Sequence, residues 1–211
     1  MNDQGYTPNA SRIMKLNDVE YIKFKLWAKY LALAAFFICI GALAYHISGE
    51  NLPKILTDRI RSIWFPAEKY DTFIDFFVII IYNSVDIFKI SFIILIAGLT
   101  YISYTITNIS NAAFAICTGF SLGCCFDFIK QQGGGSVEIL LVMVTMILCS
   151  TVLVLNCVCS VLTSQKFSEY RNVNMLLTSD FFWRYIGRFL ISFGYILIIY
   201  IVYVLIYKFI V

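Results

Sequence analysis

Residues 137–162 read VEILLVMVTMILCSTVLVLNCVCSVL, and Glu138 is the only charged residue among them. An α-helix needs about 20 mostly apolar residues to cross the hydrocarbon core of a bilayer, so this run is long enough to span. Four other runs have the same character: 27–48, 89–108, 109–128 and 186–211. The sequence therefore predicts an all-α, polytopic integral membrane protein, a helical bundle of about five transmembrane helices.

The composition excludes an ordinary soluble domain. Hydrophobic residues make up 60% of the 211 residues, charged residues make up 14%, and the mean hydropathy is +0.81. A soluble protein of this size could not bury so much apolar surface. The polar arm 1–26 is too short to be a domain, so we expect a single transmembrane domain over 27–211. No segment is large enough for an ATPase or a water-soluble catalytic domain.

Two groups of basic residues predict the orientation. One lies in or beside the arm (Arg12, Lys15, Lys23, Lys25 and Lys29), and the other precedes or begins the last run (Lys166, Arg171, Arg184 and Arg188). Five spans place both groups in the cytoplasm, as the positive-inside rule requires. We therefore expect a multi-pass protein of the cell membrane with a cytoplasmic N-terminus and Val211 outside. Ala42-Leu43-Ala44 resembles a signal-peptidase site, but the long arm before the first run favours a retained signal anchor.

The segment 71–89 is amphipathic, and its apolar core, 76–82, is too short to span. We expect an interfacial or re-entrant helix at about 71–86, on the outer face before the second span. One interpretation is a surface that docks a partner or an apolar peptide, and a simple interfacial anchor is the other. The docking surface would comprise Trp64, Phe65, Tyr70, Asp75, Asn83 and Asp86.

The last run carries Tyr200, Tyr203 and Tyr207 at helical spacing. Such aromatic stripes usually pack against neighbouring helices. The functional alternative is an aromatic surface for a hydrophobic peptide or a partner helix. Both interpretations remain open at the level of sequence.

The third run contains small residues on one helix face: Ala112, Ala115, Gly119 and Gly123. In lipid, such stripes let helix backbones approach closely, so we expect the tightest helix contact here. The stretch 119–123 also matches the G-x-S-x-G pattern of serine hydrolases. That chemistry needs a strand–turn–helix context or a histidine beside Ser121, and His46 is expected at the outer end of the first span.

Other residues that could carry chemistry are sparse. The seven cysteines all lie in apolar runs and His46 is the only histidine, so we expect no disulfide framework, metal site, cofactor or catalytic group, and hence no enzyme. Asn108, Ser110 and Asn111 predict a tight cytoplasmic turn between the second and third spans. No predicted span carries a buried acidic or basic residue at mid-depth, which argues against a proton-coupled transporter.

The middle of the chain, from Phe76 to about Phe167, resembles the stage II sporulation protein M family of membrane proteins. The resemblance rests on Asn83 after an apolar segment, Ala97-Gly98, Asn111 followed by Gly119-Phe120-x-x-Gly123, and the glycine turn 133–135. It implies a non-enzymatic membrane scaffold. Some members act with cell-wall hydrolases during engulfment. Relatives in gene clusters for circular bacteriocins are linked to maturation, secretion or self-immunity beside an ABC transporter.

The favoured function is thus an accessory or scaffold protein that acts with membrane partners or with a hydrophobic, circular bacteriocin-like peptide. Expected partners are the bilayer, an ABC transporter or further copies of the chain, and no nucleic acid. The second class is a permease-like subunit of an ABC exporter or a small oligomeric channel, which should show polar residues along several spans. The third, an intramembrane hydrolase, requires Ser121 and His46 to meet.

Overall fold

A computed structural model describes residues 8–48, 54–64, 73–131, 135–167 and 180–210, and the regular structure in these ranges is helical. The long helices are α1 (Pro8–Ser48), α3 (Phe73–Ala97), α4 (Ser103–Gln131), α5 (Ser136–Phe167) and α7 (Asp180–Ile210), and α2 (Lys54–Trp64) is short. Each of these 5 long helices contains a stretch long and apolar enough to cross a membrane. The predicted fold class, an all-helical bundle with about five candidate spans, is confirmed.

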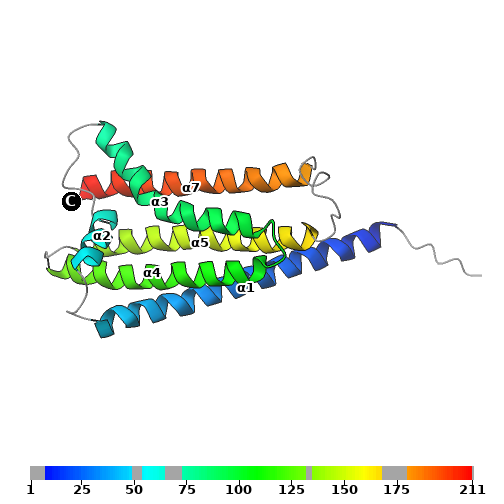
Figure 1. Ribbon diagram of the computed structural model, residues 1–211, viewed down its shortest axis with the longest axis horizontal. Coiled ribbons are helices and arrows are strands. Elements are labelled where there is room, and N and C mark those ends of the chain that lie inside the picture. The colour runs from blue at the N-terminus through cyan, green and yellow to red at the C-terminus, as the bar shows by residue number, and fades with distance from the viewer. Residues whose placement is uncertain (1–7, 49–53, 65–72, 132–134, 168–179, 211) are drawn as a thin grey trace, which may run out of the picture.

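The long helices lie side by side, and their ends gather at two opposite ends of the bundle (Figure 1). One, called here the α2 end, holds α2, the start of α3 and the last turns of α4 and α7. The opposite, basic end holds the start of α7, the last turns of α5 and the connection from α3 to α4. Because α5 contacts every other long helix, it is the central element of the bundle.

The second candidate span lies elsewhere than the sequence predicts, since it is Phe76–Ala97. The predicted span 89–108 is therefore wrong, and so is the predicted separate interfacial helix at 71–86. The predicted span 109–128 lies within α4, but α4 begins earlier, at Ser103. A short helix does accompany the five candidate spans, but it is α2.

Two polar sites explain the difference. Asp86 and Lys89 look like the edge of an apolar run, but they form an ion pair on α3 with an N–O distance of 3.3 Å. Such pairing lowers the cost of carrying both charges within an apolar helix. Asn108, Ser110 and Asn111 look like a turn, but they lie within α4. There the buried Asn111 amide donates a hydrogen bond of 3.1 Å to the Tyr30 carbonyl, a contact that a helix bundle tolerates.

The carbonyl groups at the end of α3 all find donors, which explains why the helix can end at Ala97. The Ile94 carbonyl accepts hydrogen bonds from Gly98 and from the Ser160 hydroxyl of α5, at 3.1 and 2.8 Å. The Leu95 carbonyl accepts one from the Tyr185 hydroxyl of α7 at 2.8 Å. The backbone N–H groups of Leu99 and Thr100 donate hydrogen bonds to the Ile96 and Ala97 carbonyls. Since unpaired backbone groups are costly in lipid, these contacts stabilise the break between α3 and α4.

The closest helix contact is between α1 and α4, which run in the same direction. Glycines make the approach possible, because a Cβ at Gly119 would overlap the Ile38 carbonyl and one at Gly41 would overlap the Ile116 carbonyl. Gly123 faces the Tyr45 ring, and a Cβ there would lie 2.5 Å from it. Of the other small residues in the stripe, Ala115 is buried and Ala112 is half-buried. The backbones of α1 and α4 are therefore in direct contact at Gly41 and Gly119.

Candidate functional site

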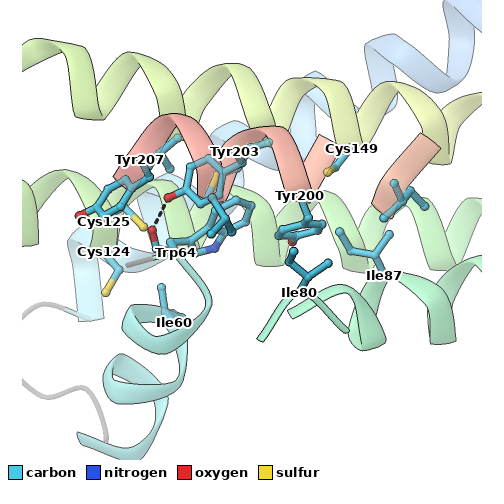
Figure 2. Close-up of a cluster of buried hydrophobic side chains, with 14 residues drawn as sticks. Ile60, Trp64, Ile80, Ile87, Cys124, Cys125, Cys149, Tyr200, Tyr203 and Tyr207 are labelled. Carbon is cyan, nitrogen blue, oxygen red and sulfur yellow. Dashed lines mark hydrogen bonds between the residues drawn. The ribbon is translucent and has the colours of Figure 1, made fainter. Parts of the chain in front are cut away.

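The aromatic residues near the α2 end pack on one another (Figure 2). Trp64, at the end of α2, stacks on Tyr200 with ring centroids 6.0 Å apart and lies edge to face with Tyr203 at 5.9 Å. The Tyr203 hydroxyl donates a hydrogen bond to the Trp64 carbonyl. The exposed fractions of Tyr200, Tyr203 and Tyr207 are only 1%, 1% and 5%. These residues therefore lie inside the fold, where they hold α2 against α7.

Of the remaining residues of the predicted docking surface, the structure describes the side chain of Asp86 alone. Phe65 and Tyr70 lie outside the described residues. Asp75 and Asn83 belong to α3, but their side chains are outside the described part of the structure. Asp86 is half-buried, and its surroundings are described.

Asp86 lies near the middle of the candidate span Phe76–Ala97. At a rise of about 1.5 Å per residue, it is about 15 Å from either end of that span. Its partner Lys89 has a side chain that is 69% exposed, and the Asp86 side chain is 50% exposed. The prediction that no span carries a buried acidic or basic residue at mid-depth did not foresee this pair, but neither side chain is buried, so it stays a prediction. A half-exposed carboxylate within a candidate span nevertheless weakens the argument against a proton-coupled transporter.

Asp86 also lines a cavity of about 290 Å³ between α2, α3, α4, α5 and α7, called here the Asp86 cavity. Thr118, Ser121 and Tyr200 supply its other side-chain hydroxyls, and most of the remaining lining is apolar. The Thr118 hydroxyl donates to the Phe114 carbonyl of its own helix at 2.9 Å. The cavity is thus a mainly apolar space with one carboxylate in its wall. This arrangement suits an apolar group that carries a hydrogen-bond donor or a positive charge.

The structure does not gather the residues that hydrolase or metal chemistry would use. Ser121 lines the Asp86 cavity, whereas His46 is exposed on α1 and does not line it. Within the described ranges, no group of three or more His, Cys, Asp or Glu side chains could hold a metal ion. The seven cysteines, four of them buried, are free thiols. The described geometry therefore brings together a binding cavity and no serine–histidine pair.

The sequence could have shown that Asp86 lies within a span only if the second span had been placed at Phe76–Ala97. The signal was present, because an uninterrupted helix from Phe76 to Ala97 already has the length of a span. It was obscured because two charges three residues apart are usually taken as a boundary. Residues three apart on a helix face one another, so the two charges can pair within a continuous helix.

Comparison with models of protein families, with curated proteins and with solved structures finds no match. The class of the molecule follows from its fold. Five long apolar helices packed into one bundle define a multi-pass helical membrane protein.

Proposed function

We propose that this protein is a non-enzymatic accessory protein of the membrane, which binds an apolar peptide segment of a partner at the Asp86 cavity. The observation that carries the proposal is the pair of charges near the middle of the candidate span Phe76–Ala97 of α3. Both side chains are at least half exposed on the bundle surface, beside an apolar cavity.

Exposing these two charges to lipid is energetically costly. A charged side chain at the centre of a transmembrane helix costs about 2.5–3.5 kcal/mol in insertion measurements. The pairing of Asp86 with Lys89 recovers part of that cost, but the Lys89 side chain is 69% exposed, and lipid tails offer its ammonium group no further acceptor. A partner segment with polar or basic groups would supply them, so covering this face is favourable.

The dimensions of the cavity favour a side chain over a large ligand. Small-molecule pockets in proteins have volumes of about 300–1,000 Å³, and the Asp86 cavity, at about 290 Å³, lies at the low end. Its mainly apolar lining matches an apolar side chain from a partner helix or peptide. Its carboxylate favours a donor or a basic group next to that side chain.

The resemblance to the stage II sporulation protein M family supports the same kind of role. It implies partners among membrane proteins, such as an ABC transporter, or a hydrophobic peptide of the circular bacteriocin type. The cellular process would then be maturation, secretion or immunity of such a peptide, or envelope remodelling.

Photo-crosslinking in native membranes tests the proposal. A photoreactive residue at Ile93, one turn after Lys89 and 49% exposed, should give a discrete peptide or protein adduct. The same residue at Ile198 on α7, which is 56% exposed, is the matched control and should give lipid adducts alone. Asp86→Asn keeps the side-chain shape and should abolish the Ile93 adduct. Equal adducts at both positions, or an adduct that survives Asp86→Asn, would contradict the proposal, and an adduct of twice the chain mass would identify a second copy as the partner.

The second candidate is a conducting role, either as a permease-like subunit or as a small oligomeric channel. The same Asp86 favours it, because intramembrane carboxylates commonly mark ion or proton pathways. Proton or ion flux into liposomes that hold the purified protein, lost on Asp86→Asn, would support conduction. Liposomes without flux above the protein-free background would count against it.

A further inference from the structure

A second cavity lies at the basic end of the bundle, far from Asp86 along the helices. It has a volume of about 410 Å³ and lies between α1, α5 and α7. Four basic side chains line it: Lys23 from α1, Lys166 from α5, and Arg184 and Arg188 from α7. Residues from the two ends of the chain thus converge on one space, where the start of α7 and the end of α5 come together (Figure 1).

The charge of this cavity is of one sign. Among the described residues, no aspartate or glutamate lines it, and none of the four cations lies within 4.0 Å of a described carboxylate. Among the described residues, Glu20 and Asp180 are the carboxylates nearest along the chain to Lys23 and Arg184, and neither lines the cavity. Glu169, three residues after Lys166, lies outside the described residues. Like charges held together repel one another, so this arrangement favours an anion in the space between them.

Two of the cations have neighbours that leave their charge uncompensated. The Lys166 ammonium lies 5.1 Å from the centroid of the Phe181 ring. The Arg188 guanidinium and the Cys159 thiol line the same cavity. A thiol is a weak acceptor, so a phosphate oxygen would compete with it for the guanidinium at little cost.

The rest of the lining is mixed: Ile22, Leu162 and Phe181 are apolar, whereas Thr163 and Gln165 add uncharged polar groups. The cavity also lies where candidate spans begin and end, since Glu20, Lys166 and Asp180 bound three of them. That is the depth of the lipid headgroups. A space that is basic on one side and apolar on the other matches a lipid at the junction of headgroup and acyl chain.

We propose that this cavity binds the phosphate group of an anionic phospholipid, with Arg184 and Arg188 as its principal ligands. The planar guanidinium forks pair with phosphate oxygens two at a time, and Lys23 and Lys166 add charge around them. The positive-inside rule explains why basic residues lie at this end, but it does not require them to meet at one cavity. An anionic phospholipid and a soluble phosphoester both carry a phosphate group that this cavity could bind.

Thermal unfolding of the full-length protein in a neutral detergent tests the assignment. Titrated phosphatidylglycerol should raise the unfolding midpoint, because a ligand that binds the folded state stabilises it, whereas phosphatidylcholine should not. Arg184→Gln and Arg188→Gln should each weaken binding by about tenfold, the usual effect of losing one charge-assisted hydrogen bond. Lys54→Gln, at the α2 end, removes one exposed positive charge elsewhere and should leave binding unchanged.

Arg188→Lys separates a phosphate site from a general charge effect, since it keeps the charge and removes the fork. It should weaken phosphatidylglycerol binding while the lipid-free unfolding midpoint stays near that of the unchanged protein, which also controls for misfolding. Glycerol phosphate, tested in parallel, assigns the source: an equal shift means a soluble phosphoester, and no shift means a lipid. Equal stabilisation by phosphatidylcholine, or unchanged binding in both Arg188 variants, would overturn the proposal.

Discussion

Replacing Gly119 by alanine should destabilise the protein, although alanine is the better helix former. The added methyl group would overlap the Ile38 carbonyl oxygen and lie 2.9 Å from the Ile38 Cα atom. Both are backbone atoms of α1, so no side-chain rotation can make room. The two helices must move apart, or α4 must shift along its axis.

The magnitude follows from three contributions. Inserting a methyl group into a tightly packed contact typically costs about 1–3 kcal/mol. Separation also weakens the neighbouring hydrogen bonds of Tyr30 with Thr107 and Asn111, now 2.7 and 3.1 Å long. Each such bond within a membrane contributes about 0.6 kcal/mol on average. The helical preference of alanine over glycine offsets about 1 kcal/mol, so we expect a net loss of about 1–3 kcal/mol.

Gly194→Ala is the matched control. This glycine lies within α7, and a Cβ built there has no neighbour within 4 Å. The same chemical change should therefore be neutral or stabilise the fold by up to about 1 kcal/mol. Gly119→Ala should lower the free energy of unfolding, whereas Gly194→Ala should leave it unchanged or raise it.

Thermal unfolding in detergent, followed with a thiol-reactive dye, measures the difference. Cys149 and Cys157 are 1% and 0% exposed, so they react with the dye when the bundle opens. The unfolding midpoint should fall for Gly119→Ala and stay level or rise for Gly194→Ala. Equal midpoints for the two variants would refute the close contact between α1 and α4.

Three further predictions concern the α2 end, the end of α3 and the topology. Tyr203→Phe removes the hydrogen bond to the Trp64 carbonyl and should cost about 1–3 kcal/mol in the same unfolding assay, whereas Tyr195→Phe, 58% exposed on the same helix, should cost nothing measurable. Ser160→Ala removes the donor to the Ile94 carbonyl and should cost about 1 kcal/mol, with faster hydrogen exchange at 98–100. In a cysteine-free background, Tyr101→Cys should react with an impermeant reagent from the cytoplasmic side alone, and Gly135→Cys from the outer side alone; the reverse pattern would refute the orientation assigned by the basic residues.

The sequence by itself determined the class of the protein and the number of its candidate spans. Each apolar run must satisfy its own backbone hydrogen bonds and match the bilayer thickness, and both requirements are local. A count along the chain therefore finds the long apolar helices without knowledge of their neighbours. The stripe at Gly119 and Gly123 likewise indicated a close contact, because small residues on one face are a local pattern.

Only the tertiary structure decided where α3 and α4 begin and end. From sequence, Asn111 indicates a turn, because a lone polar side chain is unfavourable within an apolar helix. In the bundle its amide reaches the Tyr30 carbonyl on α1, 81 positions away in the chain. A partner that distant cannot be deduced from the residues around Asn111.

The same limit applies to the partners of each helix and to both cavities. The glycine stripe did not reveal that α1 would cover it, and the basic residues did not reveal that Lys23 and Arg188 would line one space. Tyr200 and Tyr203 could face a partner or the core, and burial against Trp64 placed them inside. Which faces meet depends on the shapes and polar groups of all the helices at once, because packing and interhelical hydrogen bonds drive their association in lipid.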